Sequence, residues 1–290
     1  KGLITNKSTG IIRNEATFKN DLQGIINNNN NIINNSNFNN THLIVNKASG
    51  TIRNNNSFTN DSTINLEASS TFNNFSNFTN NKLLTVLANG LYVNKSQSTS
   101  TNNKVIDNHG TMTYDDSSTF NIEGLSTMNN KIGGTLNNNG TINSKKNSTF
   151  ENDGLFDNKS GSLTSRGLVN VFGLIRNDSM IINSGKIDIK ADAGLVINNS
   201  TVRNDSLIIS AGTYKNFLVA TTTNNQEIQN NNIIRNYGKI VNNKTFTNIL
   251  GDITNYNLVS NTALGTITNQ KTFTNKKLNA NNSDNVNLSG

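Results

Sequence analysis

The chain has 290 residues, of which 32% are hydrophobic, and a formal net charge of +7. An ordinary globular domain is roughly 45 to 50% apolar, so a large conventional core is not expected. The absence of cysteine rules out disulfides and thiolate sites. Lysine and arginine are dispersed along the chain, which favours a solvated basic surface over nucleic-acid binding. No apolar run approaches the roughly 18 residues of a membrane helix, so no transmembrane segment is expected.

The N-terminal part of the chain is a repeat. Residues 6–21 and 46–61 have nearly the same sequence, and a weaker copy fits between them. The period is 20 residues, marked by three columns: Phe18, Phe38, Phe58 and Phe78; Asn14, Asn34, Asn54 and Asn74; and Asn20, Asn40, Asn60 and Asn80. Such a period is typical of repeat proteins, in which stacking of neighbouring units creates the core. The chain contains 65 asparagines, but a disordered asparagine-rich segment would not place them in columns.

The parity of positions in residues 1–80 predicts which side chains point inward. Successive residues of a strand face opposite sides. Every charged residue of this stretch lies at an odd position, so the odd positions face water. The even positions hold the predicted core residues Ile12, Phe18, Ile32, Phe38, Ile52, Phe58, Phe72 and Phe78.

A three-residue phrase recurs within each unit: an aliphatic residue or Phe, one outward residue and an Asn, as in Ile12-Arg13-Asn14. The successive Asn residues are six, eight and six residues apart. This spacing predicts three short strands per coil, wound into a parallel β-helix of about 14 coils with about 20 residues each. Asparagine suits the corners because it tolerates left-handed backbone angles. Stacked at about 4.8 Å, the inward Asn columns are predicted to form hydrogen-bonded ladders. We expect one elongated domain over residues 1–290.

The later segments are less regular. Residues 95–104 contain almost no apolar side chain and are predicted as a loop or distorted coil, and residues 221–232 are a second such candidate. The inward parity changes between residues 158 and 175, which predicts a one-residue bulge near Arg166. Residues 279–290 are predicted as a polar tail. Repeat phrases run close to both ends of the sequence, so either end-to-end contact with other copies or excision from a longer solenoid is expected.

No constellation of chemical groups stands out. The closest is Asp107, Asp115 and Asp116 with His109, but His109 lies in a turn-like Asn-His-Gly context, and adjacent strand residues such as Asp115 and Asp116 point apart. The second histidine, His42, is far from His109 in the sequence, so no metal site is expected. Outward threonines do not share one column with Thr-x-Thr pairs, which disfavours ice binding. We expect no catalytic residue and no cofactor.

The phrases Gly-Thr-Ile-x-Asn and Thr-Phe-x-Asn, at 50–54, 265–269, 149–152 and 272–275, resemble the Asn-rich repeats of microbial cell-surface β-solenoids. Those proteins include filament, sheath and S-layer-like subunits and the passenger domains of adhesins and autotransporters. The resemblance implies an extracellular or cell-surface location and supplies no catalytic residue.

Three functions remain open. The first is a structural protein whose partners are copies of itself, assembling through solenoid ends and outward apolar residues such as Ile11 and Phe75 into a filament, sheath or surface layer. The second is an adhesin stalk or passenger that contacts a surface glycan or a host partner. The third, which the sequence favours least, is a polysaccharide-cleaving β-helix enzyme with an acidic groove.

Overall fold

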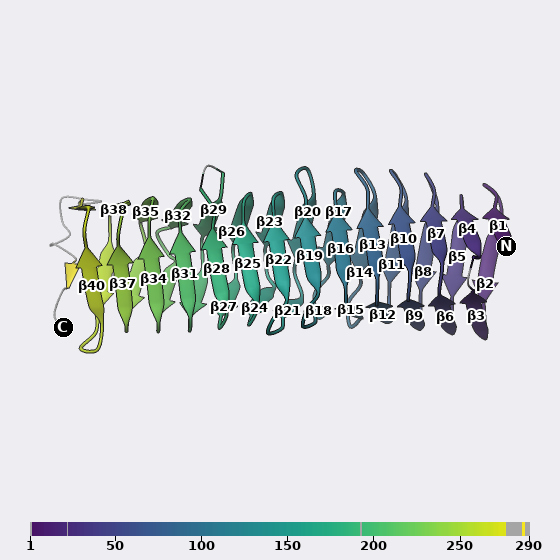
Figure 1. Cartoon of the computed structure of the whole chain (residues 1–290), viewed down its shortest axis with the longest axis horizontal. Helices are drawn as coiled ribbons and strands as arrows, with labels where there is room; N and C mark the ends of the chain where they lie inside the picture. The colour runs from purple at the N-terminus through teal and green to yellow at the C-terminus, as the bar shows by residue number, and fades with distance from the viewer. Residues whose placement is uncertain (1, 22, 192, 277–285, 288–290) are drawn as a thin grey trace.

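The computed structural model describes residues 2–21, 23–191, 193–276 and 286–287, and shows a stack of coils drawn out into a rod (Figure 1). The strands form three parallel sheets of 14 strands each. Each strand pairs with the strand three places along the chain, which belongs to the next coil. The predicted all-β parallel solenoid is confirmed, together with its coil length and its number of coils. None of the described segments forms a helix that is long and apolar enough to cross a membrane.

We name the sheets A, B and C in the order in which the chain visits them. Sheet A contains β1 (Leu3–Asn6), β4 (Ile25–Asn28), β7 (Leu43–Asn46), β10 (Thr63–Leu66), β13 (Leu83–Val86), β16 (Val105–Asn108), β19 (Thr127–Asn130), β22 (Thr149–Asn152), β25 (Leu168–Val171), β28 (Lys186–Ile189), β31 (Leu207–Ser210), β34 (Glu227–Asn230), β37 (Thr245–Asn248) and β40 (Thr266–Asn269).

Sheet B contains β2 (Ile11–Asn14), β5 (Asn31–Asn34), β8 (Thr51–Asn54), β11 (Thr71–Asn74), β14 (Leu91–Asn94), β17 (Thr111–Tyr114), β20 (Thr135–Asn138), β23 (Leu155–Asn158), β26 (Leu174–Asn177), β29 (Leu195–Asn198), β32 (Thr213–Asn216), β35 (Ile233–Asn236), β38 (Asp252–Asn255) and β41 (Thr272–Asn275).

Sheet C contains β3 (Thr17–Asn20), β6 (Asn37–Asn40), β9 (Ser57–Asn60), β12 (Asn77–Asn80), β15 (Thr99–Asn102), β18 (Thr119–Ile122), β21 (Thr141–Ser144), β24 (Ser162–Ser165), β27 (Met180–Asn183), β30 (Thr201–Asn204), β33 (Thr221–Asn224), β36 (Lys239–Asn242), β39 (Leu258–Asn261) and β42 (Val286–Asn287). The predicted polar tail, 279–290, lies outside the described residues except for this last short strand.

Each coil closes with three corners, and the length of a corner decides which parity points inward. Two- or four-residue corners keep the parity, whereas three- or five-residue corners change it. The corner between β23 and β24, residues 159–161, has three residues, so it causes the change that the sequence placed near Arg166. That placement is wrong, because Arg166 belongs to an ordinary two-residue corner. The five-residue corner 190–194 between β28 and β29 restores the first parity.

The two segments predicted as loops or distorted coils lie within the stack, so that prediction is wrong. Residues 99–102 form β15, and residues 221–232 contain β33 and β34. One inward position in each segment, in β15 and in β33, carries a hydroxyl group in place of an apolar side chain. Ser100 is 1% exposed and bonds the Tyr92 hydroxyl, and Thr222 is 0% exposed and bonds the Tyr214 hydroxyl at 2.6 Å. A large Tyr therefore pairs with a small hydroxyl residue eight positions later.

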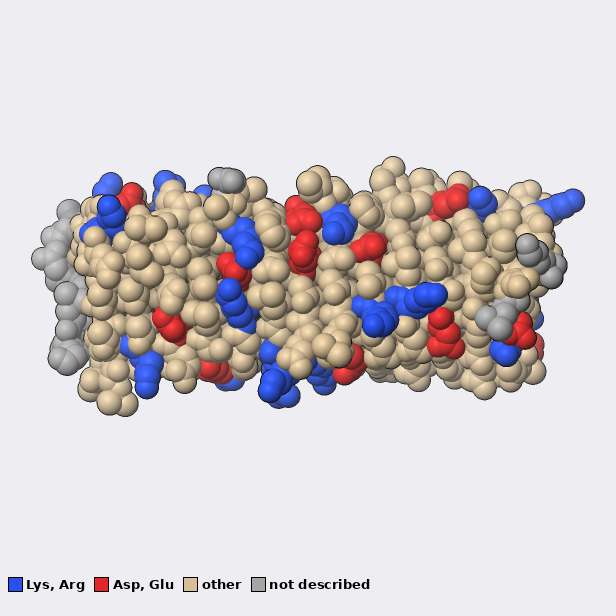
Figure 2. All heavy atoms as spheres, in the orientation of Figure 1, with Lys and Arg blue, Asp and Glu red and all other residues tan. Residues whose placement is uncertain are grey.

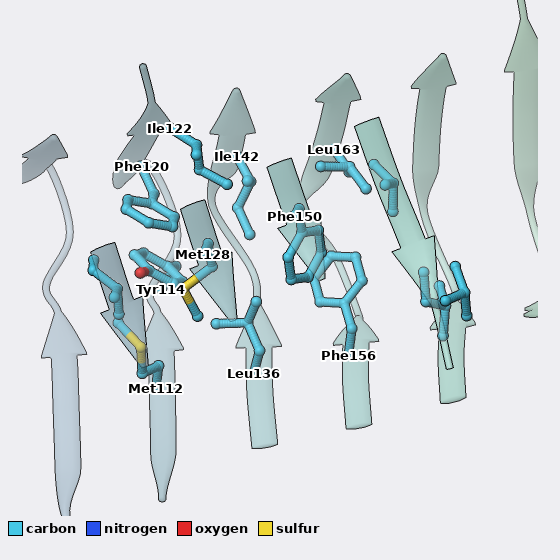
Figure 3. Packing of buried hydrophobic residues seen from close by; sticks show 14 of the residues in the cluster. Met112, Tyr114, Phe120, Ile122, Met128, Leu136, Ile142, Phe150, Phe156 and Leu163 are labelled. Carbon is cyan, nitrogen blue, oxygen red and sulfur yellow. The ribbon is translucent and has the colours of Figure 1, made fainter. Parts of the chain in front are cut away.

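The core is one continuous column inside the three sheets. Six of the predicted core residues, from Ile32 to Phe78, are at most 1% exposed, and Ile12 and Phe18 in the first coil are partly buried against them. Phe38 and Phe58 stack with ring centroids 4.4 Å apart. Further along, Phe150 and Phe156 meet edge to face at 5.3 Å (Figure 3). Each coil therefore fills the space above its neighbour, as in other close-packed interiors.

Candidate functional site

Hydrogen-bonded asparagine ladders run inside all three sheets. The last residue of most strands is a buried Asn whose Nδ2 donates to Oδ1 of the Asn one coil further along. In sheet B, Asn14, Asn34, Asn54 and Asn74 are joined at 2.7 Å. In sheet C, Asn20, Asn40, Asn60 and Asn80 are joined at 2.7 to 2.8 Å. These amides also donate to main-chain carbonyls in the next coil, as from Asn14 to Asn37 at 2.8 Å, so the ladders fasten coil to coil.

The ladders have a direction and several interruptions. In each of these bonds Nδ2 points toward the C-terminal neighbour, so every such coil offers carbonyl oxygens on one side and amide groups on the other. Apolar residues replace Asn at the ends of five strands, and all five are 0% exposed: Leu66, Val86, Val171 and Ile189 in sheet A and Ile122 in sheet C. In sheet B, Tyr114 takes the place of an Asn, and both its hydroxyl and Oδ1 of Asn138 in the next coil are buried without a partner.

The buried tyrosines test this account of the interior. Burial raises the pKa of the Tyr92, Tyr114 and Tyr214 hydroxyls above the ordinary value of 10.0. Above pH 10 the unfolded chain releases these protons while the folded chain retains them, so the free energy of unfolding falls as the pH rises. Thermal unfolding followed by circular dichroism between pH 8 and 11.5 should show a stability that is flat below pH 10 and declines above it.

A pair of variants separates the bonded hydroxyl from the orphaned one. We expect Tyr114→Phe to raise the free energy of unfolding by about 1 kcal/mol, because it removes a buried polar group without a partner. We expect Tyr214→Phe to lower it by a similar amount, about 1 kcal/mol, because the bond to Thr222 is lost. Equal effects of the two substitutions at pH 7 would refute the assignment of an unpaired hydroxyl at Tyr114.

The acidic residues that the sequence grouped with His109 are not brought together. Asp107 faces outward from β16 and accepts a hydrogen bond from Asn129 Nδ2 at 2.7 Å. His109 lies in the corner that follows β16, whereas Asp115 and Asp116 lie in the corner after β17, one sheet further around the coil. Asp115 pairs with Lys95 at 3.4 Å. In the described part of the chain, no three His, Asp or Glu side chains gather as metal ligands would.

Several buried or half-buried carboxylates are held by cations. Asp188 Oδ2 receives Lys190 Nζ at 2.6 Å and Lys186 Nζ at 2.9 Å. Burial opposes ionisation of Asp188, but these two hydrogen bonds outweigh it and hold the pKa of the carboxyl below its ordinary value. Asp157 lies 3.7 Å from Arg176 and 3.9 Å from Lys159. Figure 2 shows both signs of charge interspersed along the face of the rod that it presents.

The outer face of sheet C is uncharged over seven coils. From β6 to β24 its outward positions are Ser, Thr or Asn only: Asn37, Asn39, Ser57, Thr59, Asn77, Thr79, Thr99, Thr101, Thr119, Asn121, Thr141, Asn143, Ser162 and Thr164. Thr99, Thr119 and Thr141 stack in register, and Thr99 and Thr101 form a Thr-x-Thr pair. The prediction that outward threonines share no column with a Thr-x-Thr pair is therefore wrong for this face. The column includes β15, which lies in the segment 95–104 that was predicted as a loop.

Two hollows inside the core, lined by residues between Leu163 and Phe246, measure about 10 Å³ each, which is at most the space of one water molecule. Larger hollows lie on the outside. One of about 250 Å³ lies on sheet B over β29, β32 and β35 beside Lys215 and Arg235. Another of about 130 Å³ lies beside Lys145 and Arg166. The sequence reasoning missed both, although Lys215 and Arg235 are one period apart.

Comparisons with known proteins add little to this geometry. No protein-family model matches the chain, and no curated protein matches it. Among solved structures, the crystal structure of a TibC-catalyzed hyper-glycosylated TibA fragment is similar to this chain, with a TM-score of 0.45 and 13% sequence identity. The match covers 96% of this chain and 99% of that one. No residue role is carried over from it.

Proposed function

We propose that this chain is the shaft of a surface protein of the adhesin type, a rigid rod that holds a binding surface away from the cell. The observation that carries the proposal is the unbroken register of three 14-stranded sheets. At about 4.8 Å per coil, 14 coils make a rod of roughly 65 Å. The buried amide ladders and the stacked core resist bending, since each coil is bonded to the next on every side.

The chemistry of the surface supports a mechanical and adhesive role. The acidic residues closest to the pattern of a polysaccharide-cleaving site lie apart, with Asp107 on β16 and Asp115 and Asp116 in the corner after β17, where Asp115 pairs with Lys95. The outer face of sheet C offers hydroxyl and amide groups over seven coils. Adhesion through the surface of the rod, and a location outside the cell, agree with the resemblance of its repeats to microbial surface solenoids.

Head-to-tail assembly is a second candidate, favoured by the direction of the ladders. Because each laddered coil offers carbonyl oxygens on one side and amide groups on the other, two coil faces of this design are complementary. The complementarity holds whether the two coils belong to one chain or to two. A filament would then be a continuation of the same stack.

Electron microscopy of the purified protein distinguishes the two candidates. We expect separate rods of roughly 65 Å at all concentrations tested. Filaments whose length grows with protein concentration would refute the shaft and support assembly. On intact source cells, an antibody against the chain should label the surface without permeabilisation. Labelling that requires permeabilisation would contradict both candidates.

A further inference from the structure

The larger outer hollow has the chemistry of a binding site for an acidic sugar. It lies on sheet B, where Thr213 sits in register between the bulkier Leu195 and Ile233. The corner before β29 has five residues, whereas the corners before β32 and β35 have two. The longer corner therefore stands beside a depression over the next two coils. At position 212 no side chain fits, because a Cβ there would lie 2.2 Å from the carbonyl oxygen of Gly194.

Two cations line this hollow without a carboxylate to neutralise them. Lys215 and Arg235 are in register on β32 and β35. Their neighbours in the same column, Ile197 and Thr254, carry no charge. Among the described residues neither cation has a carboxylate within 4 Å, whereas Arg176, earlier in the same column, pairs with Asp157. Like charges on adjacent strands repel each other, and a bound anion would remove that repulsion.

Acidic groups near the hollow are few. Asp252 is exposed and in register with Ile233, one strand beyond the hollow. Its carboxylate lies in the column of Ile233, so it would repel an anionic ligand that extended to that side. Asp192, in the corner before β29, lies outside the described residues. The cations therefore dominate the part of the hollow between β32 and β35.

The rest of the lining selects among anions. Main-chain groups on a sheet face are already bonded to the adjacent strands, so an acidic peptide has no strand edge to pair with here. Thr213 and Asn232 supply a hydroxyl and an amide for ligand hydroxyls. Leu195 and Ile233 supply aliphatic contact for the C–H face of a sugar ring. The hollow contains no aromatic side chain on which a nucleic-acid base could stack.

We propose that this hollow binds an acidic polysaccharide, with Lys215 and Arg235 on a carboxylate or sulfate group and Thr213 and Asn232 on neighbouring hydroxyls. The guanidinium of Arg235 suits a two-point contact with a planar carboxylate. Three strands span about 10 Å, which accommodates a short segment of the polymer. This proposal goes beyond the shaft function. The shaft function is tested by the shape and location of the rod, whereas the binding site is tested by polymer binding.

Binding of purified full chain to polygalacturonate, dextran sulfate and neutral dextran tests the proposal. We expect binding to one or both acidic polymers, weakening as salt is added, and none to dextran. The double variant Lys215→Gln, Arg235→Gln should weaken binding about tenfold or more, because both charged contacts to the anion are lost. Binding to dextran sulfate alone would assign the anion as a sulfate ester. Binding to neither acidic polymer would overturn the proposal.

A matched control removes the same charge elsewhere. Lys82 and Lys104 are exposed cations on adjacent coils, and they line neither outer hollow. The double variant Lys82→Gln, Lys104→Gln should bind within about twofold of wild type. Thr213→Phe, which fills the hollow and keeps both cations, should weaken binding as strongly as loss of the charges. If the control variant weakens binding as much as the Lys215 and Arg235 double variant does, the polymer is attracted by the overall positive charge and the site is refuted. The site is also refuted if Thr213→Phe has no effect on binding.

Discussion

Replacing Asn54 by alanine should lower the free energy of unfolding by about 3 to 5 kcal/mol. Asn54 is 0% exposed. Its Nδ2 donates to Asn74 Oδ1 at 2.7 Å and to the main-chain carbonyls of Asn56 and Asn77, and its Oδ1 accepts from Asn34 at 2.7 Å. Alanine would leave buried partners on both neighbouring coils unsatisfied, and each such group costs about 1 to 3 kcal/mol.

The adjacent residue is the control. Asn55 is exposed in the corner, where its Nδ2 bonds Asn35 Oδ1 at 2.7 Å and its Oδ1 accepts from Arg53. Water replaces these bonds, so Asn55→Ala should change the free energy of unfolding by no more than about 0.5 kcal/mol. Urea denaturation of the three proteins gives the comparison. Similar midpoints for the two variants would show that the buried Asn54 bonds contribute no more to stability than the exposed bonds of Asn55.

The period and the inward pattern made most of the fold predictable. Phe38 and Asn40 recur as Phe58 and Asn60 because each is stacked on its copy in the next coil. A parallel, in-register stack imposes a fixed spacing wherever the corners have constant length. The sequence therefore predicts the solenoid, its coil length and the inward side of the strands from β1 to β12.

The prediction failed where polar residues point inward. A strand with an inward Ser or Thr has the polar composition that is typical of a loop. The strands that contain Ser100 and Thr222 were therefore predicted as loops. The signal that could have found them is the Tyr eight positions earlier, whose hydroxyl needs a buried partner. Tyr92 and Tyr214 each stand at that distance and supply the volume that the small residue leaves free.

The candidate site was less predictable than the fold. Lys215 and Arg235 are one coil apart and both outward, which the period alone would reveal. The hollow beside them depends on a five-residue corner at 190–194 followed by two short ones. An odd corner length shows in the sequence as a change of parity, but that change does not reveal the shape of the surface beside the corner. Pairing of cations with carboxylates, as at Asp157, also depends on which strands become neighbours.

A phenylalanine that points into the core should contribute more to the free energy of unfolding than one on the outside of the rod. Phe58 is 1% exposed, stacks on Phe38 at 4.4 Å and contacts Phe72 and Phe78 at 5.4 and 6.0 Å. Phe58→Ala would open a cavity within a rigid stack, because the strands above and below are fixed by their own ladders. We expect a loss of about 3 to 5 kcal/mol. Hydrogen exchange should localise the loss to the coils around β9.

Phe75 provides the matched comparison from a neighbouring coil. It is 38% exposed, and its ring lies 4.4 Å from the Arg53 guanidinium carbon on the outside of the rod. Phe75→Ala removes this contact and leaves no cavity, so the expected loss is about 0.5 to 1 kcal/mol. Equal losses for the two variants would mean that the core of this solenoid is loosely packed. In that case the main-chain hydrogen bonds of the sheets and the amide ladders would hold the coils together, and the effect of Asn54→Ala would have to exceed that of any core substitution.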